Sequence, residues 1–267
     1  MTTVTTTLNY LAPMQERPRY YTFEPPAGTP WRNTKGDRRQ VEVHDARGAA
    51  PPPGLETSGF EIRHLEVALA DATDAEAVRS HYYPAVEQLV RDTTGAAQVL
   101  AFDHNIRHGD AERTGVEGLQ GPVRFVHNDY TEASGPQRLR DLLGNAEALR
   151  VRGRRFAVIN VWKPLHRPVE VAPLAVCDAT TLAASDFIPT DLVYRDRTGE
   201  IYSLTFSPKH RWWYYTAMRP EEALLLKCYD SAEGRTRFTA HTAFDDPTSP
   251  PNAPPRQSIE VRTLSIF

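Results

Sequence analysis

The chain has 267 residues, of which 40% are hydrophobic and 24% are charged, so it can build a sizeable core and is not disordered as a whole. Its 31 Lys and Arg against 34 Asp and Glu give a formal charge of -3, which argues against a protein that binds phosphate backbones. No window approaches 18 uninterrupted apolar residues, and Cys177 and Cys228 form neither a zinc motif nor a dense disulfide framework. We therefore expect a cytoplasmic protein with no nucleic-acid partner and no membrane partner.

The first 60 residues are rich in proline and include the run Pro51-Pro52-Pro53-Gly54. Proline at this density leaves little room for long regular elements. We expect residues 1–60 to form an extended N-terminal arm that wraps a body formed by residues 61–267, with Met1 to Thr7 loosely held. The large aromatic side chains of this arm should be buried on the body or on a second copy in a homodimer. They are Tyr20, Tyr21, Phe23 and Trp31.

Two helices are predicted after the arm. Over residues 71–92 apolar side chains recur at helical spacing, and Pro84 should strain this helix. A shorter helix is predicted over residues 135–144, where Pro136 suits the first turn and Gly144 suits the exit.

Most of the remaining chain is predicted to form short strands separated by turns. These strands cover residues 97–102, 123–126, 155–162, 172–177, 191–195, 201–206, 212–217, 224–229 and 258–267. No repeated strand–helix–strand rhythm is present, which argues against a parallel sheet. The pattern favours a mainly β fold, with a double-stranded β-helix (jelly roll) core and flanking helices.

Three His-x-acid pairs are candidates for a metal site. A site of two His and one carboxylate needs ligands at i and i+2, which share one face at a strand end, and a second His from elsewhere in the chain. His127-Asn128-Asp129 directly follows the apolar run 123–126. His108-Gly109-Asp110 instead lies in a polar loop over residues 107–114, and His64-Leu65-Glu66 lies in an alternating stretch. Taken alone, each pair is also compatible with a simple surface hydrogen bond.

Two features later in the chain favour the first pair. His241 stands alone in an apolar, strand-like setting, and Arg256-Gln257-Ser258 precedes the last predicted strand. Because alternate residues of a strand share a face, the Arg256 guanidinium and the Ser258 hydroxyl can converge on one carboxylate.

The order and spacing of these motifs resemble the Fe(II)/2-oxoglutarate-dependent oxygenases. The resemblance is closer to the microbial natural-product branch, which includes gibberellin desaturase-like, cephalosporin methoxylation-type and asparasone-cluster hydroxylase-like proteins. The stretches that carry it are His127-Asn128-Asp129-Tyr130 and residues 159–165, 227–231, 241–244 and 255–262. No part of the first 60 residues carries a motif of this kind.

The resemblance implies an iron bound by His127, Asp129 and His241. It implies that Arg256 and Ser258 hold the distal carboxylate of 2-oxoglutarate, and Arg262 is the alternative Arg for this role. Asn160 and Trp162, which share a face of one predicted strand, would line the substrate cavity, although core packing would explain both equally well.

The implied function is that of a dioxygenase that uses Fe(II), 2-oxoglutarate and O2. It would hydroxylate or desaturate a small-molecule natural product by hydrogen abstraction from a C–H bond. One alternative is an iron-dependent oxidase or isomerase of the same fold that does not use 2-oxoglutarate. The other is a metal-free jelly-roll binding module in which His127 and His241 merely pack or form hydrogen bonds.

Overall fold

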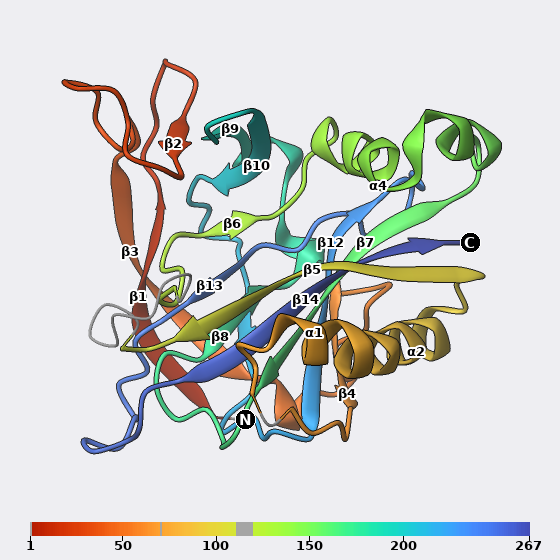
Figure 1. Ribbon diagram of the computed structural model, residues 1–267. Helices are drawn as coiled ribbons and strands as arrows, with labels where there is room; N and C mark the ends of the chain where they lie inside the picture. Colours follow the sequence, from red (N-terminus) through yellow and green to blue (C-terminus); the bar gives the residue numbers. More distant parts are fainter. Residues whose placement is uncertain (1, 70, 111–119) are drawn as a thin grey trace.

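The computed structural model describes residues 2–69, 71–110 and 120–267, and two β-sheets make up most of it (Figure 1). The larger sheet contains, in spatial order, β1 (Thr3–Leu11), β3 (Gly36–Asp45), β11 (Trp212–Tyr214), β8 (Leu174–Cys177), β13 (His241–Ala243), β6 (His127–Asn128), β10 (Thr198–Leu204), β9 (Phe187–Val193) and β2 (Arg19–Tyr21). The smaller sheet contains β4 (Phe60–His64), β12 (Glu222–Asp230), β7 (Phe156–Pro164), β14 (Gln257–Ile266) and β5 (Gln98–His108). We call them the nine-stranded and the five-stranded sheet.

Eight of these strands pass back and forth between the two sheets along the chain. β5, β7, β12 and β14 lie in the five-stranded sheet, and β6, β8, β11 and β13 lie in the nine-stranded sheet. All hydrogen-bonded pairs among these eight strands are antiparallel. This winding is that of a jelly roll, which confirms the predicted fold.

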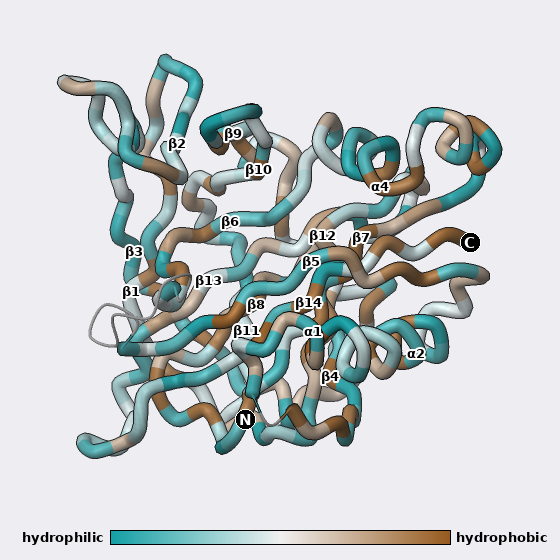
Figure 2. Tube along the Cα trace, viewed as in Figure 1, coloured by the Kyte–Doolittle hydropathy of each residue, from teal (hydrophilic) through white to brown (hydrophobic). Residues whose placement is uncertain are grey.

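Both faces of the five-stranded sheet are buried. On one face, Ile159 and Val161 of β7 pack with Val86 of the flanking helix. On the other face, Trp162 packs with Val176 of the nine-stranded sheet, in the core between the two sheets. Every residue of β7 is buried for this reason, so its sequence reads as a mostly apolar run instead of an alternating pattern. Figure 2 shows hydrophobic residues along the central strands and a mainly hydrophilic region around β2 and β3.

The helix predicted over residues 71–92 forms in three parts: α1 (Ala75–Ala77), the π-helical turn η2 (Val78–Tyr82) and α2 (Tyr83–Thr94). Pro84 has no N–H to donate and its ring crowds the preceding turn, so the helix widens just before it. The second predicted helix, α4 (Ser134–Arg150), breaks at Gly144, where φ is 73°, and then continues beyond the expected end. Three 3-10 turns complete the helical elements: η1 (Ala46–Gly48), η3 (Ala179–Thr181) and η4 (Ala184–Asp186). None of the helices in the described ranges is long and apolar enough to span a membrane.

The strands near the predicted metal ligands differ from their expected limits. Residues 123–126 are not a strand, and β6 consists of His127 and Asn128 alone. β5 continues to His108, which the sequence placed in a polar loop. Residues 111–114 of that expected loop lie outside the described residues.

The first 60 residues contribute three strands to the nine-stranded sheet. β1 pairs with β3, and β3 pairs in parallel with β11. The expectation of a loosely held start is wrong for residues 3–7, because Val4 and Thr6 are buried within β1. Tyr20 and Trp31 are not buried on the body, since they are 42% and 52% exposed at the β2 edge of the sheet, and their burial on a second copy in a homodimer stays a prediction. A domain boundary at residue 60 stays a prediction.

Candidate metal centre

The three predicted ligands come together inside the jelly roll. β6 and β13 are neighbours in the nine-stranded sheet, and His127 lies directly opposite His241 across this pair. Asp129 follows β6 immediately, so its carboxylate returns to the face of His127. The ligand atoms of these three residues all lie within 4.8 Å of one another, which is close enough for them to hold one metal ion.

The two imidazole rings are oriented by the backbone. The Nδ1 atom of His127 lies 2.7 Å from the Phe125 carbonyl, and that of His241 lies 3.1 Å from the Thr239 carbonyl. Because a carbonyl oxygen can only accept, each Nδ1 must carry the hydrogen, which leaves Nε2 with a free lone pair. Burial, and secondarily the proximity of His127, lowers the pKa of His241 to about 4, so this ring is neutral at pH 7.

The two oxygens of Asp129 have different neighbours. Oδ1 lies 3.5 Å from Nε2 of His127. Oδ2 accepts hydrogen bonds from Nε of Arg262 at 3.0 Å and from Nδ2 of Asn160 at 2.8 Å. Burial alone would raise the pKa of Asp129, but Arg262 and His127 outweigh it and hold that pKa well below its usual range. Asp129 is therefore an ionised carboxylate that keeps Oδ1 toward the metal position.

Arg256 and Ser258 lie on β14 or just before it, and both are buried. Arg256 donates from one guanidinium nitrogen to the Ala172 carbonyl at 2.6 Å and lies over the Trp162 ring. Among the described residues, Nε of Arg256 and Oγ of Ser258 have no hydrogen-bond partner. Burial, and secondarily Arg107 and Arg124, lowers the pKa of Arg256 to about 9, which reflects the cost of an unpaired buried cation.

Arg262, the alternative to Arg256 in the sequence analysis, already contacts protein carboxylates. Besides its bond to Asp129, it donates to Oδ2 of Asp103 at 2.9 Å, and its third nitrogen lies 3.6 Å from Oε1 of Glu260. Burial alone would lower the pKa of Arg262, but Asp129 and Glu260 outweigh it and raise that pKa well above its usual value.

A narrow cavity lies among most of these groups, and neither Ser258 nor Asn160 is among its lining residues. Its lining includes the three candidate ligands, Arg256 and Arg262, together with apolar side chains and two charged residues that the sequence analysis missed. The further lining residues are Arg107, Val123, Trp162, Leu174, Ala243 and Glu260. Glu260 was detectable in principle, because it lies two positions from both Ser258 and Arg262 on the same strand face.

The other His-x-acid pairs lie outside this cluster. His108 is bonded through Nε2 to the Gln257 side chain at 2.9 Å. His64 lies 3.6 Å from Glu66, with both side chains mostly exposed.

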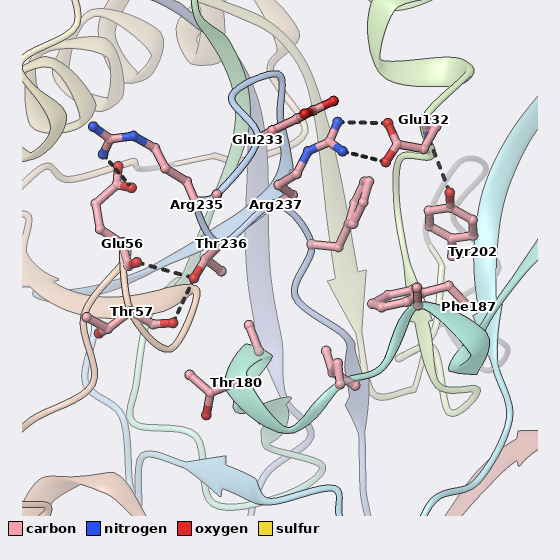
Figure 3. A pocket seen from close by; sticks show the side chains of 15 residues that line it. Glu56, Thr57, Glu132, Thr180, Phe187, Tyr202, Glu233, Arg235, Thr236 and Arg237 are labelled. Atoms are coloured by element: carbon pink, nitrogen blue, oxygen red, sulfur yellow. Dashed lines mark hydrogen bonds and ion pairs between the residues drawn. The ribbon is translucent and has the colours of Figure 1, made fainter.

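A larger hollow, of about 1160 Å³, lies elsewhere on the molecule (Figure 3). Phe187, Tyr202 and Phe238 are among its lining residues, and Arg237 and Glu132 form a bidentate ion pair at its rim. It shares no lining residue with the metal cluster.

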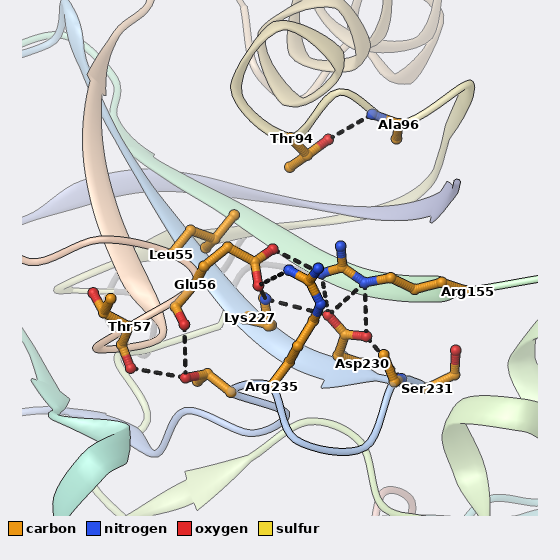
Figure 4. A network of polar contacts seen from close by, with 12 residues as sticks. Leu55, Glu56, Thr57, Thr94, Ala96, Arg155, Lys227, Asp230, Ser231 and Arg235 are labelled. Atoms are coloured by element: carbon orange, nitrogen blue, oxygen red, sulfur yellow. Dashed lines mark hydrogen bonds and ion pairs between the residues drawn. The ribbon is translucent and has the colours of Figure 1, made fainter.

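One wall of this hollow belongs to a charged network around Glu56 (Figure 4). The Glu56 carboxylate contacts three cations, with distances of 2.8 Å to Lys227, 2.7 Å to Arg155 and 3.1 Å to Arg235. Arg155 and Lys227 also contact the buried Asp230. The network fixes the segment before β4 to the ends of β7 and β12.

Known proteins resemble this chain along nearly its whole length. A family model described as "Oxidoreductase/YMDC permease-like domain" matches residues 8–266. The Fe(II)/2-oxoglutarate-dependent dioxygenase nvfI of Aspergillus novofumigatus is 35% identical over 254 residues, which cover 92% of this chain and 89% of that protein. The hydroxylase/desaturase efuI of Hormonema carpetanum is 31% identical over 288 residues, which cover 99% and 95%.

Solved structures agree with these sequence matches. A variant of the iron and alpha-ketoglutarate-dependent endoperoxidase NvfI matches with a TM-score of 0.92 and 30% identity, covering 100% of this chain and 98% of that one. The same endoperoxidase in a different conformation matches with a TM-score of 0.90 and 32% identity, covering 99% and 98%. Alpha-ketoglutarate is another name for 2-oxoglutarate, so the sequence and structure comparisons point to the same cosubstrate.

Proposed function

Because the chain belongs to the Fe(II)/2-oxoglutarate-dependent dioxygenases, we propose that His127, Asp129 and His241 bind its iron and that the adjoining cavity is the active site. The observation that carries this proposal is the convergence of the three ligand atoms within 4.8 Å. Two Nε2 lone pairs and one carboxylate oxygen make the donor set that suits Fe(II), and such a set leaves coordination positions open for other molecules. With 2-oxoglutarate and O2, iron in such a site supplies the oxidising power to remove hydrogen from an unactivated C–H bond.

We propose that Arg256 and Ser258 hold the distal carboxylate of 2-oxoglutarate. The orphaned Nε of Arg256 and Oγ of Ser258 are buried polar atoms that a ligand carboxylate would satisfy. The same carboxylate would compensate the buried charge of Arg256. Arg262 is the weaker candidate, since its donors already serve Asp129 and Asp103.

We propose that the substrate is a small-molecule natural product, which the enzyme hydroxylates or desaturates. Trp162, Val123 and Leu174 give the cavity apolar walls suited to a carbon skeleton. Asn160 faces the same region, with its amide nitrogen bonded to Asp129. The task of these residues is to hold one C–H bond close to the metal and to keep bulk water away from it.

The cosubstrate site is tested with Arg256→Gln in protein loaded with Co(II), which occupies the site without reacting. Isothermal titration calorimetry should show a 2-oxoglutarate Kd at least about 30-fold higher than in the wild type, because a buried charge pair loses one partner. Arg150→Gln, which changes an exposed Arg on α4, is the matched control and should bind normally. Unchanged 2-oxoglutarate affinity in Arg256→Gln would contradict the assignment.

The reaction class is tested by product analysis. Succinate should form in one-to-one ratio with an oxidised natural product when 2-oxoglutarate is supplied. Substrate oxidation without succinate would favour an iron-dependent oxidase, and rearrangement of the substrate without net oxidation or succinate would favour an isomerase. A protein that takes up no stoichiometric Fe(II) would be a metal-free binding module.

The setting in which the enzyme works is also proposed. We infer a cytoplasmic enzyme, as a monomer or homodimer, without nucleic-acid or membrane partners. The net charge of -3 supports the first of these exclusions, and the two buried free cysteines fit a reducing compartment. Size-exclusion chromatography with light scattering measures the oligomeric state.

A further inference from the structure

We propose that Arg262 and Asn160 are positioning residues that hold Asp129 as a metal ligand through its outer oxygen. This inference rests on the proposed iron site. Arg262 and Asn160 lie directly opposite each other on β14 and β7. Their donors, Nε and Nδ2, both reach Oδ2 of Asp129, at 3.0 Å and 2.8 Å. Oδ1 is the oxygen left facing His127 and the metal position.

The hydrogen bonds from Arg262 and Asn160 to Asp129 cross the interior of the jelly roll. The three candidate ligands belong to the nine-stranded sheet or follow it, whereas Arg262 and Asn160 belong to the five-stranded sheet. Asp129 follows a strand of only two residues, so little local structure fixes its rotamer. Residues of other strands must therefore hold its carboxylate in place. Arg262 and Asn160 do this from β14 and β7, which belong to a sheet that is buried on both faces.

Glu260 is a second carboxylate that contacts Asn160 and Arg262. Its Oε1 lies 3.3 Å from Nδ2 of Asn160 and 3.6 Å from the guanidinium of Arg262. Nδ2 of Asn160 is therefore shared between the two carboxylates, and the Arg262 guanidinium faces Asp129 through Nε and Glu260 through another nitrogen. This explains why Arg262 is buried at the site without being free for a ligand.

The test compares metal binding with cosubstrate binding in Arg262→Gln. Its Co(II) Kd, measured without 2-oxoglutarate, should rise about 10- to 100-fold, as found when the partners of metal ligands are removed. The absorption bands of bound Co(II), which report ligand geometry, should shift as well. The 2-oxoglutarate Kd at saturating Co(II) should change less than about 3-fold. Arg256→Gln is the matched control with the opposite pattern, since it should bind Co(II) normally and lose 2-oxoglutarate affinity.

A second variant guards against misfolding. If circular dichroism shows that Arg262→Gln is unfolded, Asn160→Ala decides, because it removes one donor and keeps the Arg262 charge pair. Wild-type Co(II) affinity in both folded variants, or in Asn160→Ala alone when Arg262→Gln is unfolded, would overturn the positioning role. Normal Co(II) binding with weak 2-oxoglutarate binding in Arg262→Gln would make Arg262 the carboxylate clamp. A wild-type protein that binds no Co(II) would instead overturn the proposed function itself, and the positioning role with it.

Discussion

His127 and His241 present Nε2 to the metal position because the backbone already holds each Nδ1 hydrogen. Replacing either ring, or Asp129, by Ala removes one of three ligands, so turnover should fall at least about 100-fold while the fold is kept. Succinate formation measures the loss of turnover in the three variants, and thermal unfolding and Co(II) titration check the fold and the metal site. His64→Ala, on an exposed side chain, should match the wild type in both. Full activity in His127→Ala would mean that the ligand set is wrong.

The candidate ligands were predictable from sequence because they obey the alternation of strands. His127 and Asp129 are two positions apart and His241 sits in a short apolar run, which made them candidates, and the resemblance to the oxygenases singled them out among the three His-x-acid pairs. The roles of Arg256 and Arg262 were not separable in this way. Arg262 lies on β14 and Arg256 just before it, and what distinguishes them is that Asp103 of β5 and Asp129 after β6 contact Arg262. Such contacts between distant segments leave no local signal.

At the scale of single elements, β1 is anchored to the nine-stranded sheet by Tyr10. Its buried hydroxyl accepts from Nε1 of Trp212 at 2.8 Å and lies 3.2 Å from Nδ1 of His210. Tyr10→Phe leaves a buried indole N–H without a partner, so the free energy of unfolding should fall by about 1 to 3 kcal/mol. Chemical denaturation measures it, with Tyr20→Phe on an exposed ring as the control. Equal stability of the two variants would show that the bond contributes nothing.

The segment before β4 is held by Glu56, and its contribution depends on pH. Burial alone would raise the pKa of Glu56, but Lys227 and Arg155 outweigh it and lower the pKa to about 2. A carboxylate with a lowered pKa stabilises the folded state above its unfolded pKa, near 4.5, and that stability is lost as pH falls toward 2. Because 41% of the side chain is exposed, the effect at pH 7 should be about 1 to 2 kcal/mol.

The measurement compares Glu56→Gln with the wild type by chemical denaturation across pH. Their difference in the free energy of unfolding should be constant near pH 7 and shrink below pH 4.5. Glu147→Gln, which breaks the exposed pair with Arg150, should show little difference at any pH. The same pH dependence in both variants would exclude a special role for Glu56.

The elements that sequence analysis missed had weak or misleading signals. β1 does alternate, with Val4, Thr6, Leu8 and Tyr10 buried, but its threonine content and the prolines after it suggested a loose arm. β6 is two residues long, too short for any periodicity. The interruptions at Pro84 and Gly144 were easier to predict, because each follows from the backbone chemistry of one residue.

At the scale of the whole molecule, β1 and β3 form one edge of the nine-stranded sheet. Val4, Leu8, Tyr10 and Val43 pack there in one cluster with Trp212. Removing residues 1–45 should therefore lower the midpoint of thermal unfolding by at least about 10 °C, since several large buried side chains are lost. Differential scanning calorimetry measures this. A truncated chain that is as stable and active as the full chain would show that these strands are dispensable, and a stable but inactive one would place them in the active site.

The jelly roll itself was predictable because it needs many short strands without a parallel rhythm, and that pattern covers residues 97–267. The two additions to the nine-stranded sheet, β1 with β3 at one edge and β10, β9 and β2 at the other, were not. They attach through pairings such as β3 with β11, between residues far apart in the chain. The local sequence pattern predicts where strands form, whereas the pairing of strands depends on tertiary packing.

The position of β14 has a consequence for how the protein is made. It is the last strand in the chain, yet it lies between β7 and β5, where Gln98 pairs with Ile266. During translation β5 and β7 thus leave the ribosome long before their shared neighbour exists, with two hydrophobic strand edges open to other chains. The nascent chain cannot close its barrel step by step.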